Sequence, residues 1–300
     1  MISALRSLLE RRAQPLPDHI RRPVLGLTTV GLIAAVLWAW RTADFAISDL
    51  RWGPVIALAL IAAPASLVLK AAEFIVAARI AGQSPTRRTA AETAVVSSAA
   101  NLLPLPGSLL VTVRALSEGG VSFGGAVAAS AIPGLAWLGA TGLVGGTAIV
   151  AEGAVLLGIA VIAAGAVALA GAASMFAATA PATGRIRLGA AVLVVEIAWL
   201  LTSGLRFVLA AAAIGLDLTF TQALVLSVAG AASVAIGFVP GGLGVREALI
   251  AALSPLIGLD VDAGLILGVV DRVVWLAVLG VAALSLAAIQ PSVRVRKENS

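Results

Sequence analysis

The chain has 300 residues, of which 60% are hydrophobic and only 12% are charged, and its formal net charge is +5. Soluble domains contain about 45–50% apolar residues, so this composition predicts an all-α polytopic membrane protein. Cysteine is absent and the single histidine, His19, precedes the first apolar run. The membrane body therefore lacks the residues for thiolate chemistry, disulfides, histidine metal clusters or a Ser-His triad. We therefore expect no catalytic residues, no metal and no cofactor. We also expect no nucleic-acid partner, because the chain has no tyrosine and few aromatic residues for base stacking.

The first residues, 1–22, form a basic head with five arginines, which we expect to be cytoplasmic. The apolar run that follows, 23–40, ends without a small-residue cleavage site, so it is predicted to be a retained first span. One membrane domain is expected over 23–290. The tail, 291–300, is again basic and is predicted to be cytoplasmic.

A helix needs about 20 apolar residues to cross a bilayer. Six segments meet this requirement: 23–40, 54–78, 121–148, 154–179, 188–215 and 263–289. Two further segments, 89–118 and 220–258, are interrupted by proline and glycine near their middles. We predict that these are helix–break–helix hairpins, either re-entrant or fully spanning. Paired glycines such as Gly145-Gly146 predict close helix packing.

The distribution of charge over the loops predicts the orientation, because Lys and Arg mark the cytoplasmic side. The loops 79–88 and 181–187 contain arginines, whereas 149–153, 216–219 and 259–262 contain only acidic charges. Six spans and two hairpins place the basic loops and both termini inside and the acidic loops outside. The Ala/Arg-rich, Lys-poor composition favours a bacterial cytoplasmic (inner) membrane.

The two hairpins also predict an internal repeat, with halves at about 54–148 and 188–289. Residues 80–90 resemble 214–223, and each stretch leads through a helix rich in small residues to a Pro/Gly break. Three predicted spans separate the hairpins, so the repeat would have inverted topology. Inverted repeats underlie alternating access in several transporter folds.

The break in the second hairpin is the most informative stretch, and residues 237–247 read Gly-Phe-Val-Pro-Gly-Gly-Leu-Gly-Val-Arg-Glu. Irregular backbone at membrane depth is tolerated only where it is buried in protein or lines a cavity. The N–H groups that begin the next half-helix favour an anion, and an arginine offers a bidentate fork to a phosphate. Glu247 is expected to stabilise the helix N-terminus or to pair with an arginine. The predicted binding residues here are Pro240, Gly241, Gly242, Gly244, Arg246 and Glu247. The alternative is a glycine-rich packing corner whose charges snorkel to the interface.

The break in the first hairpin reads Asn-Leu-Leu-Pro-Leu-Pro-Gly over 101–107. Asn101 is predicted to satisfy backbone groups freed by Pro104 and Pro106, with Gly107 ending the break. Arg114 is expected either to stand opposite Arg246 or to snorkel to the surface.

Ionisable residues deep in spans are functional candidates because a central charge is costly. Asp271 and Arg272 lie inside the last span, and Glu196 and Arg206 lie inside 188–215. These four complete the predicted substrate-binding set, which also includes Asn101, Pro104, Gly107 and Arg114 of the first hairpin. Lys70 and Glu73, at i and i+3, are predicted to pair with each other. The alternative for all of these charges is mutual pairing that fixes helix packing.

The segment from Val239 to Glu247 closely resembles the Pro-x-x-Gly-Gly-x-Gly-x-Arg-Glu signature of the lysylphosphatidylglycerol synthase transmembrane region, or flippase-like domain family. The stretch 101–107 with Arg114 is similar to the first motif of that family, and Arg272 matches its late arginine. Ser108 stands where the family motif has Glu, and no aminoacyl-transferase domain accompanies these 300 residues. The resemblance implies movement of anionic, aminoacylated or polyprenyl-linked lipids between leaflets.

Together these observations predict a membrane lipid translocator, not an enzyme, whose substrate is a phospholipid or polyprenyl-linked lipid. No phosphate-binding Gly-x-x-x-x-Gly-Lys-Ser/Thr loop is present, so transport would be downhill or coupled to an ion or proton gradient. Glu247 and Asp271 are the candidate proton relays. One alternative is a non-transporting membrane partner that regulates an envelope-lipid biosynthetic enzyme. A second is an intramembrane lipid-linked transferase, which the scattered acidic residues disfavour.

Overall fold

The computed structural model describes residues 47–101, 107–236 and 244–289, and all regular structure within these ranges is helical. The predicted head, first span and tail lie outside the described residues. Five described helices are long and apolar enough to cross a membrane: Trp52–Ile80, Phe123–Ala151, Val155–Thr179, Arg185–Ala213 and Val261–Leu286. They coincide with five of the six predicted spans. The described part of the chain is therefore all-helical and has the character of a membrane protein.

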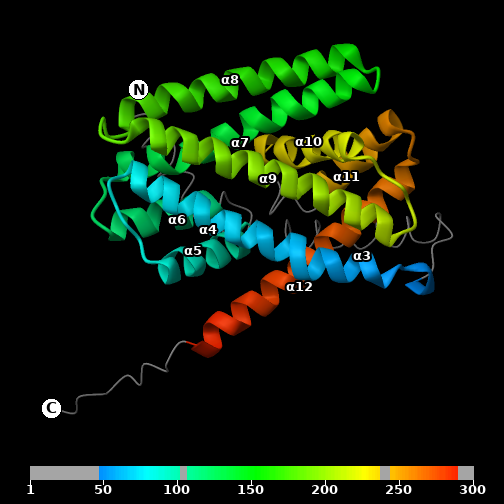
Figure 1. Ribbon diagram of the computed structural model, residues 1–300, viewed down its shortest axis with the longest axis horizontal. Coiled ribbons are helices and arrows are strands. Elements are labelled where there is room, and N and C mark those ends of the chain that lie inside the picture. The colour runs from blue at the N-terminus through cyan, green and yellow to red at the C-terminus, as the bar shows by residue number, and fades with distance from the viewer. Residues whose placement is uncertain (1–46, 102–106, 237–243, 290–300) are drawn as a thin grey trace, which may run out of the picture.

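The first of these helices is continuous but not uniform. It begins as α3 (Trp52–Ala57), passes through a π-helical segment (Leu58–Ala62) and continues as α4 (Ala63–Ile80). Pro64 follows the π-helical segment and has no N–H to donate, so the regular ladder is interrupted at this point. The start of α3 is anchored to the end of α9 (Arg185–Ala213), because the Arg51 N–H donates to the Ala213 carbonyl at 2.8 Å. The helix Trp52–Ile80 and α9 therefore run antiparallel, side by side (Figure 1).

Two pairs of short helices occupy the predicted hairpins. The first pair is α5 (Arg87–Ala100) and α6 (Gly107–Glu118), and the second is α10 (Phe220–Ile236) and α11 (Val245–Leu253). The members of each pair pack against each other. The prolines and glycines between them, at 102–106 and 237–243, lie outside the described residues.

The longest packing contact is between α7 (Phe123–Ala151) and α8 (Val155–Thr179), which form the long hairpin along one edge of Figure 1. Glycines on facing surfaces allow it: a Cβ on Gly142 would lie 2.6 Å from the Cα of Gly165. On the next turn of α7, a Cβ on Gly146 would meet Gly158 and Ile162 of α8, and one on Gly145 would collide with Val228 of α10. The predicted role of the Gly145-Gly146 pair in close packing is confirmed.

The last long helix, α12 (Val261–Ile289), packs on α11, α9 and α5. Its second half extends away from the other helices, as Figure 1 shows. Gly264 and Gly268 bring α11 close, because a Cβ on Gly264 would collide with Ser254 and one on Gly268 would lie 3.1 Å from Ile250 Cδ1. This close approach places the first turn of α11 directly against the charged middle of α12.

Candidate functional site

Five charged residues from three helices meet in the interior, and we call this group the arginine cluster. Its members are Arg206 on α9, Arg246 and Glu247 on α11, and Asp271 and Arg272 on α12. All five side chains are at least 85% buried, with 11%, 15% and 13% exposure for the three arginines and 1% and 0% for Glu247 and Asp271. The structure therefore brings together five predicted binding residues that are distant in the sequence.

Asp271 is the centre of the arginine cluster. Its Oδ1 accepts from Arg206 Nε at 2.8 Å, and its Oδ2 accepts from Arg206 Nη2 at 3.0 Å and from Arg246 Nη2 at 2.8 Å. The pair with Arg206 is bidentate, the geometry in which a guanidinium binds a carboxylate most strongly. One carboxylate thus holds two arginines from different helices, and both of its oxygens are occupied.

Glu247 performs both of the roles that were predicted for it. Its Oε2 accepts a hydrogen bond from the Gly244 N–H at 2.9 Å, which stabilises the start of α11. Its Oε1 lies 3.3 Å from Arg272 Nε. Gly244 has φ +81°, a conformation that a side chain would strain. The glycine and the glutamate together fix where α11 begins, and so where Arg246 points.

Uncharged neighbours complete the surroundings of the arginines. Arg206 lies 4.8 Å from the ring centroid of Trp275, and Arg246 lies 5.3 Å from that of Phe207, so both have cation–π contacts. Arg206 Nη1 also lies 3.4 Å from Ser66 Oγ on α4. The sequence analysis missed these three partners, because their contacts join distant helices and leave no local signal. The Gly-x-x-x-Gly spacing of Gly264 and Gly268 is a sequence signal that could have predicted the close approach of another helix to α12.

The net charge of the arginine cluster is positive. Counted over the described residues, three guanidiniums and two carboxylates give +1 inside an apolar helical body. Unbalanced charge is expensive in such surroundings, so this excess favours an anion. Among the described residues, no group of three or more His, Cys, Asp or Glu side chains is placed to hold a metal ion.

Glu196 lies apart from the arginine cluster, although Glu196 and Arg206 were both predicted to bind substrate. It is ten positions earlier on α9, which is about 15 Å along the helix, and it is only 2% exposed. The charges that act on it belong to Glu73 and Lys70 of α4. Lys70 and Glu73 pair as predicted, with Lys70 Nζ 2.9 Å from both carboxylate oxygens.

The residues of the first hairpin form a separate place in the structure. Asn101 Oδ1 accepts from the Ser108 N–H at 2.9 Å, so its side chain does bond backbone across the break. Gly107 allows the two helices to meet, because a Cβ there would collide with the Ala100 carbonyl. Arg114 is not brought to the arginine cluster: its side chain is 81% exposed and its Nε donates to Glu118 at 2.8 Å. That ion pair raises the pKa of Arg114 above its ordinary value.

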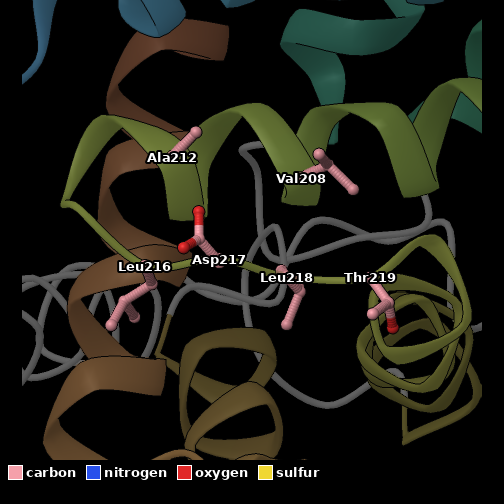
Figure 2. Close-up of a pocket in the computed structure, with 6 residues that line it drawn as sticks. All are labelled: Val208, Ala212, Leu216, Asp217, Leu218 and Thr219. Atoms are coloured by element: carbon pink, nitrogen blue, oxygen red, sulfur yellow. The ribbon is translucent and has the colours of Figure 1, made fainter.

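Four predicted site residues, Pro104, Pro240, Gly241 and Gly242, lie outside the described residues. The structure also shows one small pocket of about 230 Å³, which none of the predicted binding residues lines. Figure 2 shows it between Val208 and Ala212 of α9 and the loop residues Leu216 to Thr219, with Asp217 as its charged side chain. An acidic pocket at the end of α9 does not suit an anionic headgroup.

No protein-family model matches the chain, and no curated protein matches it. The similarity to the flippase-like family therefore stays a prediction from the residues quoted above.

Proposed function

We propose that this chain is a membrane lipid translocator that binds the phosphate of an anionic lipid headgroup at the arginine cluster. The observation that carries the proposal is the combination of three buried arginines with only two carboxylates, at the first turn of the helix that follows the 237–243 segment. Guanidinium groups bind phosphate oxygens in bidentate fashion. A headgroup with one negative charge would bring the net charge of the arginine cluster to zero.

The order of helices supports a transport cycle. A long helix, two short helices and a long helix occur as Trp52–Ile80, α5, α6, α7 and again as α9, α10, α11, α12. We propose that these halves form an inverted repeat, so that the two hairpins open toward opposite sides of a bacterial inner membrane. Substrate sites of such transporters lie near the midplane at the repeat interface. The arginine cluster includes residues of the second half and touches Ser66 of the first.

The test is redistribution of headgroup-tagged phospholipids between leaflets of vesicles that contain the purified protein. Arg246→Gln is the informative variant, because it removes the excess positive charge and leaves the bidentate Arg206–Asp271 pair in place. Arg88→Gln is the matched control, since Arg88 is an exposed arginine that pairs with Glu92 on α5. We expect phosphatidylglycerol to move with wild type and the control, and its movement to fall at least tenfold with Arg246→Gln.

Two outcomes would contradict the proposal. If folded wild-type protein moves no lipid of any headgroup, the alternative of a non-transporting membrane partner becomes the better account. If Arg246→Gln moves phosphatidylglycerol as fast as wild type does, the arginine cluster is not the headgroup site.

A further inference from the structure

A second charged group lies apart from the arginine cluster. It consists of Lys70 and Glu73 on α4 and Glu196 on α9, and we call it the Glu196 group. Glu196 is 2% exposed, and its Oε1 is buried without a hydrogen-bond partner among the described residues. Glu73, in contrast, is held by Lys70 through both oxygens. Of the two glutamates, Glu196 is therefore the one whose carboxylate makes no ion pair or hydrogen bond within the described structure.

The other helices that pack on α9 do not supply a counter-charge for Glu196. The helices α3, α7 and α10 contain no ionisable residue. On α4, Arg79 is exposed at the far end, and on α12 the charges at 271 and 272 are engaged in the arginine cluster. On α9 itself, Arg206 is bound to Asp271. Arg185 and Arg187 lie in the first turn of α9, nine or more residues from Glu196, and Arg185 Nη2 donates to the Ala180 carbonyl. Burial acts most strongly on Glu196, and Lys70 and Glu73 are the charges that act on it in addition.

Counting the charges of these two groups of described residues gives two balanced states. With Glu196 ionised, the Glu196 group (Lys70, Glu73 and Glu196) has a net charge of −1 and offsets the +1 of the empty arginine cluster. With Glu196 protonated, this group is neutral, and the arginine cluster is neutral when it holds a headgroup with one negative charge. The two mixed states leave an unbalanced charge in an apolar interior, which is costly.

We propose that Glu196 is a proton-binding site, and that binding of an anionic headgroup at the arginine cluster is accompanied by proton uptake at Glu196. This inference rests on the proposed function and supplies its coupling ion. It replaces Glu247 and Asp271 as proton relays, because each of those carboxylates is engaged by an arginine. By linkage, protonation of Glu196 strengthens headgroup binding by the same factor by which the headgroup strengthens proton binding.

The size of the coupling follows from the separation of the two groups. For unit charges about 15 Å apart and an effective dielectric constant of about 20, Coulomb's law gives a factor of about six. A factor of six corresponds to uptake of at most about 0.4 proton per bound lipid, at the pH where Glu196 is half-protonated.

The test is calorimetric titration of the protein in micelles with short-chain phosphatidylglycerol, over a pH series and in two buffers with different ionisation enthalpies. The phosphodiester keeps its single charge over the series, so any proton uptake belongs to the protein. We expect wild type to bind about sixfold more tightly at the acidic end and to take up protons. Glu196→Gln should bind at every pH with the affinity that wild type has at the acidic end, without proton uptake. Glu92→Gln, a partly exposed carboxylate on α5, should follow wild type.

An independent readout separates titration of Glu196 from a merely structural role. Infrared spectra should show a carboxylic-acid C=O band that decreases as the pH rises and that is missing in Glu196→Gln. Binding by wild type that is independent of pH, or a pH dependence that survives in Glu196→Gln, would overturn the inference and leave headgroup binding intact. If wild type binds no phosphatidylglycerol at any pH, the proposed function fails and this inference fails with it.

Discussion

Replacing Asp271 with asparagine should be one of the most destabilising conservative substitutions in the chain. The carboxylate is fully buried and accepts three hydrogen bonds from two guanidiniums. Asparagine has one acceptor oxygen, so the substitution removes the negative charge and changes the net charge of the arginine cluster from +1 to +2. Breaking a buried ion pair by removing one partner costs about 3–5 kcal/mol, and we expect a loss of that size in the free energy of unfolding.

The measurement is reversible unfolding in mixed micelles with a rising fraction of a denaturing detergent. Asp262→Asn is the matched control, because it makes the same chemical change in the first turn of α12, where Asp262 is partly exposed. The control should change the free energy of unfolding by about 0.5 kcal/mol or less. Adding Arg206→Gln to Asp271→Asn restores the +1 charge and should recover at least 1 kcal/mol, within the range of coupling energies of residues in contact. Equal stability of the Asp271→Asn and Asp262→Asn proteins would refute the view that Asp271 holds the arginines together.

Three further predictions concern packing, ion pairing and orientation. Gly264→Val should lower the free energy of unfolding by about 1–3 kcal/mol, because its side chain would displace Ser254 and separate α11 from α12. Gly280→Val should be nearly neutral in the same unfolding assay, since a Cβ on Gly280 meets nothing within 4 Å. A similar loss of stability in both variants would contradict this packing. Lys70→Met should destabilise the protein more than Lys70→Met combined with Glu73→Gln does, since the single change leaves a carboxylate without its partner; the opposite order would show that the pair is not stabilising. Because the chain has no cysteine, Thr86→Cys and Thr183→Cys should react with an impermeant maleimide from the cytoplasmic side, and Glu152→Cys and Asp217→Cys from the other side. Labelling of all four from one side would contradict the proposed topology.

The span positions could be predicted from the sequence because a bilayer imposes a minimum apolar length. Five predicted segments coincide with long helices. The short helices α6, α10 and α11 fall within the two interrupted segments, and α5 begins two residues before the first of them. The first break could be located in the sequence only by its prolines. Arg114, which follows this break, was predicted to be a binding residue, but its side chain is exposed and pairs with Glu118. Its partner Glu118 is four residues later on the same helix, which is a local signal for an exposed ion pair.

The partners within the arginine cluster could not be predicted from the sequence. The spacing between Arg206 and Asp271 contains no periodic signal, because their contact depends on how α9 and α12 cross. The distance between Glu196 and Arg206 follows from their spacing on one helix, but the grouping of Glu196 with Lys70 and Glu73 depends on which residues of α4 face α9. Sequence patterns identified the charges that membrane burial makes costly, and only tertiary packing decided which of them pair.

The central claim is that the excess positive charge of the arginine cluster binds a phosphate headgroup. The most direct measurement is native mass spectrometry of lipids retained by the protein after release from mixed vesicles of phosphatidylglycerol, phosphatidylcholine and diacylglycerol. The account predicts that wild type and Arg88→Gln retain phosphatidylglycerol in preference to the other two lipids. Arg246→Gln, which makes the arginine cluster neutral, should lose that preference. Retention of phosphatidylglycerol to the same extent by Arg246→Gln, or retention of diacylglycerol as readily as phosphatidylglycerol by wild type, would contradict the claim.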